Sequence, residues 1–89
     1  MEFEWDDTKA EANIAKHDID FDTAIDLFDG RVVIETRSVY PDEERWQRTG
    51  IVDERFMTVI WTHRGDVIRI ISARRARTNE KRDYHNNNA

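Results

Sequence analysis

The stretch from Arg55 to Ala73 reads RFMTVIWTHRGDVIRIISA and has the most regular pattern in the chain. Apolar residues recur at alternate positions on both sides of Arg64-Gly65-Asp66, and a period of two is typical of β-strands. A Gly-Asp pair between two such runs is typical of a tight turn. The stretch therefore predicts an antiparallel hairpin of two strands, Arg55–His63 and Val67–Ala73.

Two more strands are expected on the N-terminal side of this hairpin. Arg31–Arg37 contains a run of β-branched residues, and Asp29-Gly30 before it is a turn signal. Glu44–Val52 is a more polar strand, and Asp53-Glu54 predicts a tight turn from it into Arg55. The regular spacing and the short turns favour a four-stranded antiparallel meander.

Two helices are expected before the strands. Asp6 is placed to cap a helix of about ten residues that ends at His17, with Asp18 in a left-handed conformation after it. A second, shorter helix is expected from Phe21 to Phe28. Its core-facing stripe follows helical spacing and consists of Phe21, Ala24, Ile25 and Phe28.

After the strands, Thr78 is expected to cap a last helix that runs to about His85, and residues 86–89 are expected to form a disordered tail. The predicted order is two N-terminal helices, a four-stranded antiparallel sheet and a C-terminal helix, ααββββα. This is an α+β fold with helices packed on one face of the sheet. The length of 89 residues predicts a single domain over residues 1–85.

The composition excludes several classes of protein. The chain has no cysteine, which excludes disulfide frameworks, thiolate zinc sites and cysteine nucleophiles. Its acidic first residues and short apolar runs predict neither a signal peptide nor a membrane span, so we expect a cytoplasmic protein. Asp18-x-Asp20-x-Asp22 lacks the glycine and closing glutamate of a calcium loop, and the three histidines lack a zinc-ligand spacing. We therefore expect no metal and no other cofactor.

The formal net charge of −5 hides a strong asymmetry along the chain. Residues 1–44 contain fourteen acidic and four basic residues, a net charge of −10, whereas residues 45–89 contain five acidic and ten basic residues, a net charge of +5. Such asymmetry is typical of two surfaces with different partners, one polyanionic and one cationic. It also fits two halves that neutralise each other across the fold, and composition leaves both interpretations open.

Four blocks of sequence, taken together, resemble the BrnT toxins of bacterial type II toxin–antitoxin systems. The blocks are Phe3-Glu4-Trp5-Asp6 followed by Lys9, Asn13, Lys16-His17 and Phe21; Glu44-Arg45-Trp46 with Gly50; the strand Arg55–Trp61; and Arg69-Ile70-Ile71-Ser72-Ala73-Arg74-Arg75-Ala76 with Glu80. They stand in the family's order and cover the chain from Glu2 to about Tyr84. Asp18 departs from the glycine that usually follows the Lys-His pair.

This resemblance implies a RelE-like ribonuclease fold and a toxin that inhibits translation by metal-independent cleavage of an RNA substrate. It also implies a hetero-oligomer with a BrnA-like antitoxin that carries a ribbon-helix-helix domain. The antitoxin would make the DNA contacts when the complex represses its own promoter, so this protein would meet DNA only indirectly. No membrane partner is expected.

Metal-independent cleavage needs a base for the 2′-OH proton, cations for the charge that develops on the phosphate, and an acid for the departing 5′-oxygen. The candidate catalytic residues are His17, His63, Arg64, Arg74 and Tyr84. His17 also extends an apolar helix stripe, where a histidine is commonly a packed, hydrogen-bonded residue. The arginines have the alternative role of solvated or ion-paired side chains.

The candidate RNA-binding residues are Lys9, Lys16, Trp46, Arg69, Arg75 and Arg77. Lys9 and Lys16 share a helix stripe with Asn13, which either grips a phosphate or forms a solvated face. Trp46 either stacks on a base or covers the sheet or the antitoxin. Arg69 either contacts a phosphate or pairs with a sheet carboxylate such as Glu35.

A function of another class also fits the sequence. The protein would then be a non-catalytic binding module that sequesters a ribbon-helix-helix DNA-binding partner and modulates transcriptional autorepression. The acidic N-terminal half and the lack of a compact acid/base dyad favour this alternative. Growth arrest on expression of the chain alone distinguishes a toxin from such a module.

Overall fold

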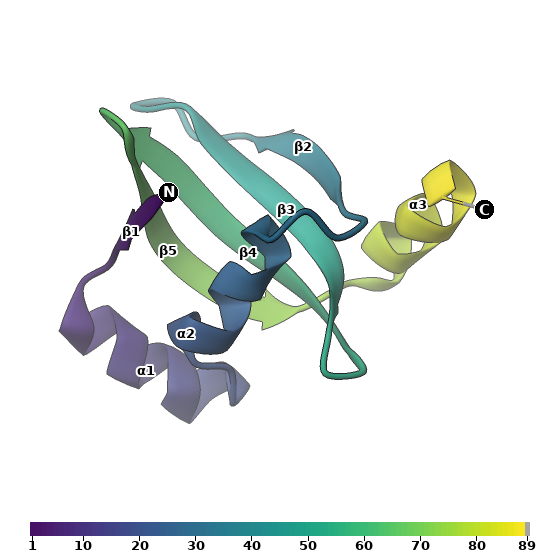
Figure 1. The fold of residues 1–89 in the computed structure, drawn as a ribbon, viewed down its shortest axis with the longest axis horizontal. Coiled ribbons are helices and arrows are strands. Elements are labelled where there is room, and N and C mark those ends of the chain that lie inside the picture. The colour runs from purple at the N-terminus through teal and green to yellow at the C-terminus, as the bar shows by residue number, and fades with distance from the viewer. Residues whose placement is uncertain (89) are drawn as a thin grey trace.

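The computed structural model describes residues 1–88, and Ala89 lies outside the described part of the chain (Figure 1). The elements in chain order are β1 (Glu2–Glu4), α1 (Asp7–His17), α2 (Phe21–Ala24), the 3-10 helix η1 (Ile25–Phe28), β2 (Ile34–Ser38), β3 (Arg45–Val52), β4 (Arg55–Arg64), β5 (Val67–Arg75) and α3 (Thr78–Asn88). The strands form one sheet in the order β1-β5-β4-β3-β2.

The predicted fold of two N-terminal helices and a four-stranded antiparallel sheet is wrong, because a fifth strand precedes the helices. β1 pairs parallel with β5, Phe3 lying opposite Ile68, so the sheet is mixed. β1 has only three residues and its partner lies more than sixty positions away, so no local pattern of turn and strand indicates the pairing. The strand is held by Phe3, whose ring packs edge-on against Phe28 with centroids 5.3 Å apart.

The predicted hairpin is present and forms the centre of the sheet. β4 and β5 pair antiparallel, with Arg64 opposite Val67 across a two-residue loop. Gly65 has a φ of 61° in that loop, a conformation that glycine adopts without steric cost. The strands β2, β3 and β4 continue the antiparallel order, as the sequence predicts for this part.

The second hairpin loop, between β3 and β4, carries backbone strain. Val52 lies opposite Arg55, so Asp53 and Glu54 alone form the loop, with φ values of 49° and 68°. Two positive φ values in a two-residue loop are typical of a type I′ turn, in which the second position favours glycine. Glu54 therefore occupies a left-handed conformation at a steric cost.

We predict that Glu54→Gly raises the free energy of unfolding by about 0.5–1 kcal/mol, because glycine removes this cost and loses some of the gain through its freer unfolded chain. Asp53→Gly is the matched control and should gain less, since aspartate tolerates the left-handed region better than glutamate. Urea denaturation measures both variants. A Glu54→Gly variant that is less stable than the wild type would show that the backbone at Glu54 is not strained.

The predicted helix signals around α1 are confirmed. The Asp6 side chain accepts a hydrogen bond from the Lys9 backbone N–H at 2.9 Å, and this cap starts α1. Asp18 ends the helix with a φ of 57° and donates its backbone N–H to the Ile14 carbonyl. Asp20 caps the next helix by accepting from the Thr23 N–H at 2.6 Å.

The segment from Phe21 to Phe28 is helical but tightens halfway from an α-helix to a 3-10 helix. A 3-10 helix has three residues per turn, so its buried positions recur every three residues. Phe21, Ala24 and Leu27 are accordingly buried, whereas Ile25 and Phe28 are only half-buried. These side chains pack on Met57 and Val59 of β4 to form the core between helices and sheet.

The helices cover both faces of the sheet rather than the one face that was expected. On β4, Trp61 contacts Phe28 of η1, whereas Phe56 contacts Tyr84 of α3. Residues 56 and 61 are an odd number of positions apart, so their side chains point to opposite faces.

α3 runs from Thr78 to Asn88, so Thr78 is its first helical residue and residues 86–88 continue the helix. Within residues 1–88 no helix combines the length and apolar character needed to span a membrane.

Candidate functional site

Ion pairs divide the basic residues into two groups. Eight of the fourteen lysines and arginines pair with a carboxylate among residues 1–88: Arg31, Arg37, Arg45, Arg48, Arg64, Arg69, Arg74 and Arg82. In four of these pairs an acid of the N-terminal half neutralises an arginine of the C-terminal half: Glu4–Arg69, Glu35–Arg48, Glu43–Arg45 and Glu43–Arg64. The interpretation of two halves that neutralise each other is therefore confirmed for these arginines.

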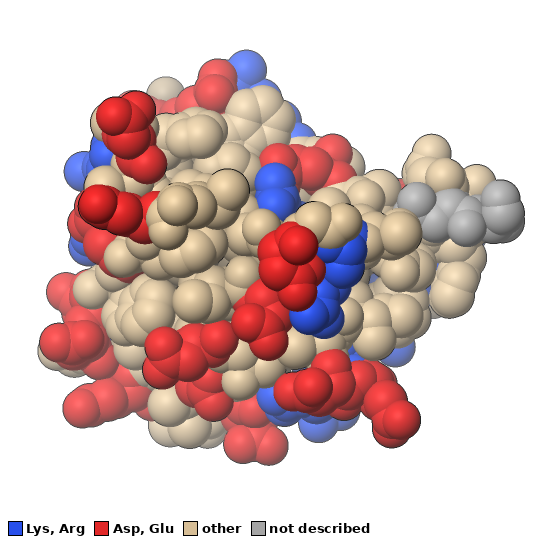
Figure 2. All heavy atoms as spheres, in the orientation of Figure 1, with Lys and Arg blue, Asp and Glu red and all other residues tan. Residues whose placement is uncertain are grey.

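The other basic residues have no ion-pair partner in the described part of the chain. They are Lys9, Lys16, Arg55, Arg75, Arg77 and Lys81. Figure 2 shows the side of the molecule that carries α1 and α2, where acidic side chains dominate the left and lower parts. A polyanion would therefore bind where the six unpaired cations lie.

Five of these six cations line three adjoining pockets at one end of the sheet. The pockets have volumes of about 260, 380 and 250 Å³. Arg75 lines both the first and the second, while Lys16 and His17 line both the second and the third. We call this continuous region the basic surface and define it by Lys9, Lys16, His17, Arg55, Arg75 and Lys81.

The basic surface is built where α1, β4, β5 and α3 meet. Lys16 and His17 are the last two residues of α1, and Arg75 is the last residue of β5. The Arg55 guanidinium donates a 2.8 Å hydrogen bond to the backbone carbonyl of Asp18, which ties the start of β4 to the end of α1. The carbonyl partner is neutral, so Arg55 is positioned without losing its charge.

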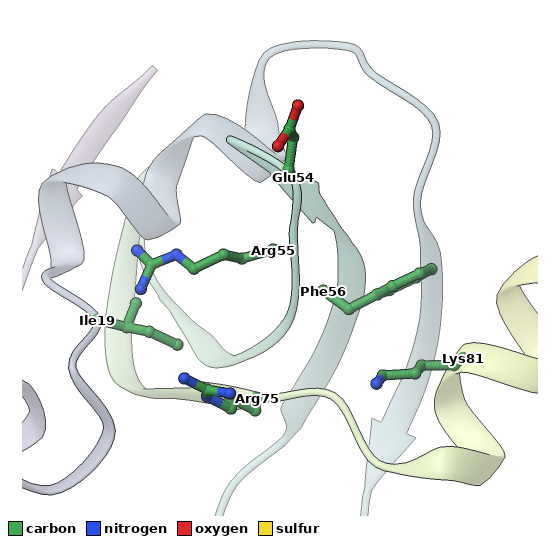
Figure 3. A pocket seen from close by; sticks show the side chains of 6 residues that line it. All are labelled: Ile19, Glu54, Arg55, Phe56, Arg75 and Lys81. Carbon is green, nitrogen blue, oxygen red and sulfur yellow. The ribbon is translucent and has the colours of Figure 1, made fainter.

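Figure 3 shows the first pocket, in which the side chains of Arg55, Arg75 and Lys81 lie around one opening. Phe56 forms part of its wall, and the Lys81 ammonium lies 5.9 Å from the centroid of that ring. The Glu54 carboxylate also lines the pocket but points away from its centre. The arrangement is suited to an anion with an apolar or aromatic portion.

Arg74, a candidate catalytic residue, lines the second pocket, but its guanidinium is engaged by α3. Its two terminal nitrogens donate to the two carboxylate oxygens of Glu80 at 2.8 and 2.9 Å. Glu80 also accepts from the Thr58 hydroxyl at 3.0 Å and from the Arg77 backbone N–H at 2.7 Å. The Arg74 and Glu80 side chains are only 15% and 12% exposed, so the pair acts as a clamp between β5 and α3.

The surroundings of Glu80 also lower the pKa of its carboxyl group. Burial by itself would raise the pKa of this carboxyl, but the hydrogen bonds from Arg74 and Arg77, the charge of Arg74 and the Thr58 hydroxyl outweigh it. Together they lower the pKa of Glu80 from 4.5 to about 2. A carboxylate with a lowered pKa stabilises the folded state fully above pH 4.5, and this contribution is lost as the pH falls towards 2.

We therefore predict that the wild-type protein loses about 1–2 kcal/mol more stability than Glu80→Gln when the pH falls from 5 to about 2, a value reduced for solvent screening. Denaturation curves at closely spaced pH values measure this difference. Asp83→Asn removes the charge of an exposed carboxylate of the same helix; it is the control and should follow the wild-type curve. If the stability of the wild type and that of Glu80→Gln changed equally with pH, the Glu80 carboxylate would not stabilise the fold through its bonds to Arg74.

His63 and Arg64, two further catalytic candidates, lie at the opposite end of β4 from Arg55. At about 3.3 Å per residue, His63 is about 25 Å from the start of the strand. The His63 ring packs edge-on against Trp61 with centroids 4.8 Å apart, and Arg64 pairs with Glu43 at 3.5 Å. The structure thus brings His17 and Arg74 to one pocket and separates them from His63 and Arg64.

Trp46 lies close to His63, at the end of the sheet away from the basic surface. Its ring stacks on Trp61 with centroids 6.3 Å apart, and its indole nitrogen is buried without a hydrogen-bond partner among residues 1–88. The Trp46 ring thus lies against a residue of the sheet, and its role towards RNA or an antitoxin stays a prediction. Arg69 was expected either to contact a phosphate or to pair with a sheet carboxylate such as Glu35. It pairs with a sheet carboxylate, but this is Glu4 of β1. Glu35 instead accepts from Arg48 and from the Trp61 indole.

The remaining candidates lie on or beside α3 and α1. Tyr84 packs edge-on against Phe56 with centroids 5.1 Å apart, so it stands behind the wall of the first pocket. Arg77 is exposed and precedes α3. Lys9 lies on exposed α1 surface and reaches the third pocket. Within residues 1–88 no three His, Asp or Glu side chains are grouped so that they would hold a metal ion.

Sequence reasoning missed Arg55 and Lys81 as members of the site. Both were assigned only to a strand or a helix, because their place beside Arg75 depends on contacts between β4, β5 and α3. It also placed Asn13 in a polar stripe with Lys9 and Lys16, whereas Asn13 is buried and bonded to backbone. The helical spacing groups Asn13 with Lys9 and Lys16 and does not indicate that the asparagine is buried while the lysines are exposed.

A comparison with known families gives a match over most of the chain. The family model described as "Ribonuclease toxin, BrnT, of type II toxin-antitoxin system" matches residues 5–80. This range includes five of the six residues of the basic surface, Lys81 lying one position beyond it. No curated protein matches the chain at a significant level.

Proposed function

Because the chain belongs to the BrnT family of ribonuclease toxins of type II toxin–antitoxin systems, we propose that it cleaves RNA without a metal ion at the basic surface. The observation that carries this proposal is that five of the six unpaired cations line three adjoining pockets, two of which are also lined by His17. A surface of uncompensated lysine and arginine side chains binds the phosphate backbone of a nucleic acid. The imidazole of His17 beside them supplies a nitrogen that can take a proton from a reacting hydroxyl.

In the proposed reaction, Lys16 and Arg75 hold the scissile phosphate and stabilise the charge that develops on it. His17 takes the proton from the 2′-OH, and the 2′-oxygen forms a bond to phosphorus while the bond from phosphorus to the 5′-oxygen breaks. The departing 5′-oxygen takes a proton from solvent. The products are a 2′,3′-cyclic phosphate and a 5′-hydroxyl end, so atoms and charge balance without a further reactant.

A type II system includes an antitoxin protein, and we propose that this partner covers the basic surface in a hetero-oligomer. Covering it would block the RNA-binding cations and so neutralise the toxin. We further propose a BrnA-like antitoxin with a ribbon-helix-helix domain, which would leave the DNA contacts to the partner. The acidic side of α1 and α2 supports this division, because like charges repel a DNA backbone (Figure 2). The proposed place of action is the cytoplasm.

The decisive experiment incubates the purified free protein with mRNA in the presence of EDTA and maps the ends of the fragments. We expect cleavage with 2′,3′-cyclic phosphate ends, and we expect equimolar antitoxin to suppress it. RNA binding should weaken steeply with added salt, as backbone recognition requires. Cleavage that needs an added divalent cation, or RNA that stays intact with the free protein, would contradict the proposal.

Expression in cells separates this function from that of a non-catalytic module. A toxin arrests growth when expressed alone and is cured by its antitoxin, whereas a module that only sequesters a DNA-binding partner leaves growth unchanged. His17→Ala in the same expression system shows whether arrest depends on the proposed site.

A further inference from the structure

The first pocket differs from the rest of the basic surface because it is bordered on several sides. The loop between α1 and α2 lies on one side of it, the β3–β4 turn on another, and the passage from β5 into α3 on a third (Figure 3). Its volume of about 260 Å³ is close to the lower end of the range for small-ligand pockets. A pocket bordered in this way suits the end of a ligand better than the middle of a passing strand.

The charge of this pocket exceeds what one phosphodiester would neutralise. Arg55, Arg75 and Lys81 line it without an ion-pair partner in the described residues, and Glu54 supplies the single lining carboxylate. The lining residues thus carry a formal charge of about +2 at neutral pH. An internal phosphodiester carries one negative charge, whereas a terminal phosphate carries about −1.5 to −2 at pH 7.

The Phe56 wall gives the pocket a second chemical character. The ring is half-buried, lines the pocket and has Tyr84 packed edge-on behind it, so its position is held from the α3 side. Aromatic rings in such positions stack on the bases of single-stranded RNA. Cations for a phosphate and an aromatic wall for a base together match one terminal nucleotide.

We propose that the pocket lined by Arg55, Phe56, Arg75 and Lys81 binds the terminal phosphate of an RNA strand and its attached nucleotide. This inference rests on the proposed function in one respect, namely that the ligand is RNA. Arg75 also lines the neighbouring pocket of Lys16 and His17, so a strand anchored here continues towards the proposed cleavage site. The shared chemistry is a phosphomonoester at a chain end, at either the 5′ or the 3′ position.

Binding of non-cleavable RNA tests this assignment independently of catalysis. Fluorescently labelled 2′-O-methyl tetranucleotides of one sequence are compared with a 5′-phosphate, a 3′-phosphate or neither, at fixed ionic strength, by anisotropy with the full chain. We expect one of the two phosphorylated oligonucleotides to bind about tenfold more tightly than the unphosphorylated one, the gain of one additional charged hydrogen bond.

Variants then assign the preference to the pocket. Lys81→Ala and Arg75→Ala should each abolish it, whereas the matched control Arg82→Ala, which removes an exposed charge from the next position of α3, should retain it. Unfolding midpoints confirm that each variant is folded. Equal binding of the three oligonucleotides, or a preference that survives Lys81→Ala, would overturn the inference. A Lys81→Ala variant that weakens only antitoxin binding would overturn it too, by assigning the pocket to the protein partner.

The same measurements keep this inference apart from the proposed function. An end-phosphate preference in a protein that leaves mRNA intact supports the pocket and contradicts the ribonuclease. Cleavage of mRNA by a protein without such a preference supports the ribonuclease and contradicts the pocket.

Discussion

Replacing Asn13 by alanine should lower the free energy of unfolding by about 3 kcal/mol, a large effect for a polar side chain. Asn13 is 6% exposed on α1. Its amide nitrogen donates to the carbonyls of Ile19 and Ala73 at 2.9 and 2.8 Å, and its amide oxygen accepts from the Ala73 N–H at 3.1 Å. The side chain thus pairs with the strand edge of β5 as another strand would.

The size of this effect follows from the position of Ala73. β1 pairs with β5 only over Val67–Arg69, so the edge of β5 at Ala73 has no neighbouring strand on that side. Alanine at position 13 would leave buried backbone groups without partners, at about 1–3 kcal/mol for each. For a domain with a typical stability of about 5–15 kcal/mol, this is a large fraction.

Urea denaturation at neutral pH measures the change, with the slope of the transition as a check on two-state behaviour. Glu11→Ala, an exposed position on the same helix, is the matched control and should change the stability by less than about 0.5 kcal/mol. An Asn13→Ala variant within about 1 kcal/mol of the wild type would show that water or a backbone shift replaces the lost hydrogen bonds.

His17→Ala should lower the rate of RNA cleavage by about 10²–10⁴, since it removes the proposed proton acceptor from the 2′-OH. Arg75→Ala should lower it by about 10²–10³ through the loss of a cation that stabilises the developing charge. Single-turnover cleavage of a labelled RNA measures both effects. Circular dichroism and unfolding midpoints verify that the variants are folded.

His63→Ala is the control for His17→Ala, because it also removes an imidazole but only His17 lines the basic surface. We expect His63→Ala to cleave at nearly the wild-type rate. A loss of activity in His63→Ala that equals the loss in His17→Ala would transfer the active site to the β4–β5 turn, where His63 and Arg64 lie. The two histidines therefore test the two clusters of catalytic candidates against each other.

The parts of the fold that the sequence predicted correctly are those that depend on neighbouring residues. The cap at Asp6 and the left-handed Asp18 each involve a hydrogen bond between residues three or four positions apart. The β4–β5 hairpin likewise combines two alternating runs with a two-residue loop. Such local interactions are present in the sequence pattern itself.

The errors concern contacts between distant residues. The strand at Glu2–Glu4 was missed because only pairing with Val67–Arg69 makes it a strand. The change from α to 3-10 geometry, which buries Leu27 in place of Ile25 and Phe28, depends on packing against the sheet. The sequence also does not show that Arg74 is paired with Glu80 or that Trp46 stacks on Trp61, because both contacts exist only in the folded chain.

The sequence by itself determined the family, the central hairpin and the excess of positive charge in the C-terminal half, because each is a property of residue order or local spacing. Only the tertiary structure decided which of those charges remain available. Glu4 pairs with Arg69 and Glu35 with Arg48 between neighbouring strands, so these arginines are neutralised. Lys16, Arg55, Arg75 and Lys81 instead line two adjoining pockets and have no carboxylate partner among residues 1–88. Charge acts through space, and the distances that govern it are set by the fold.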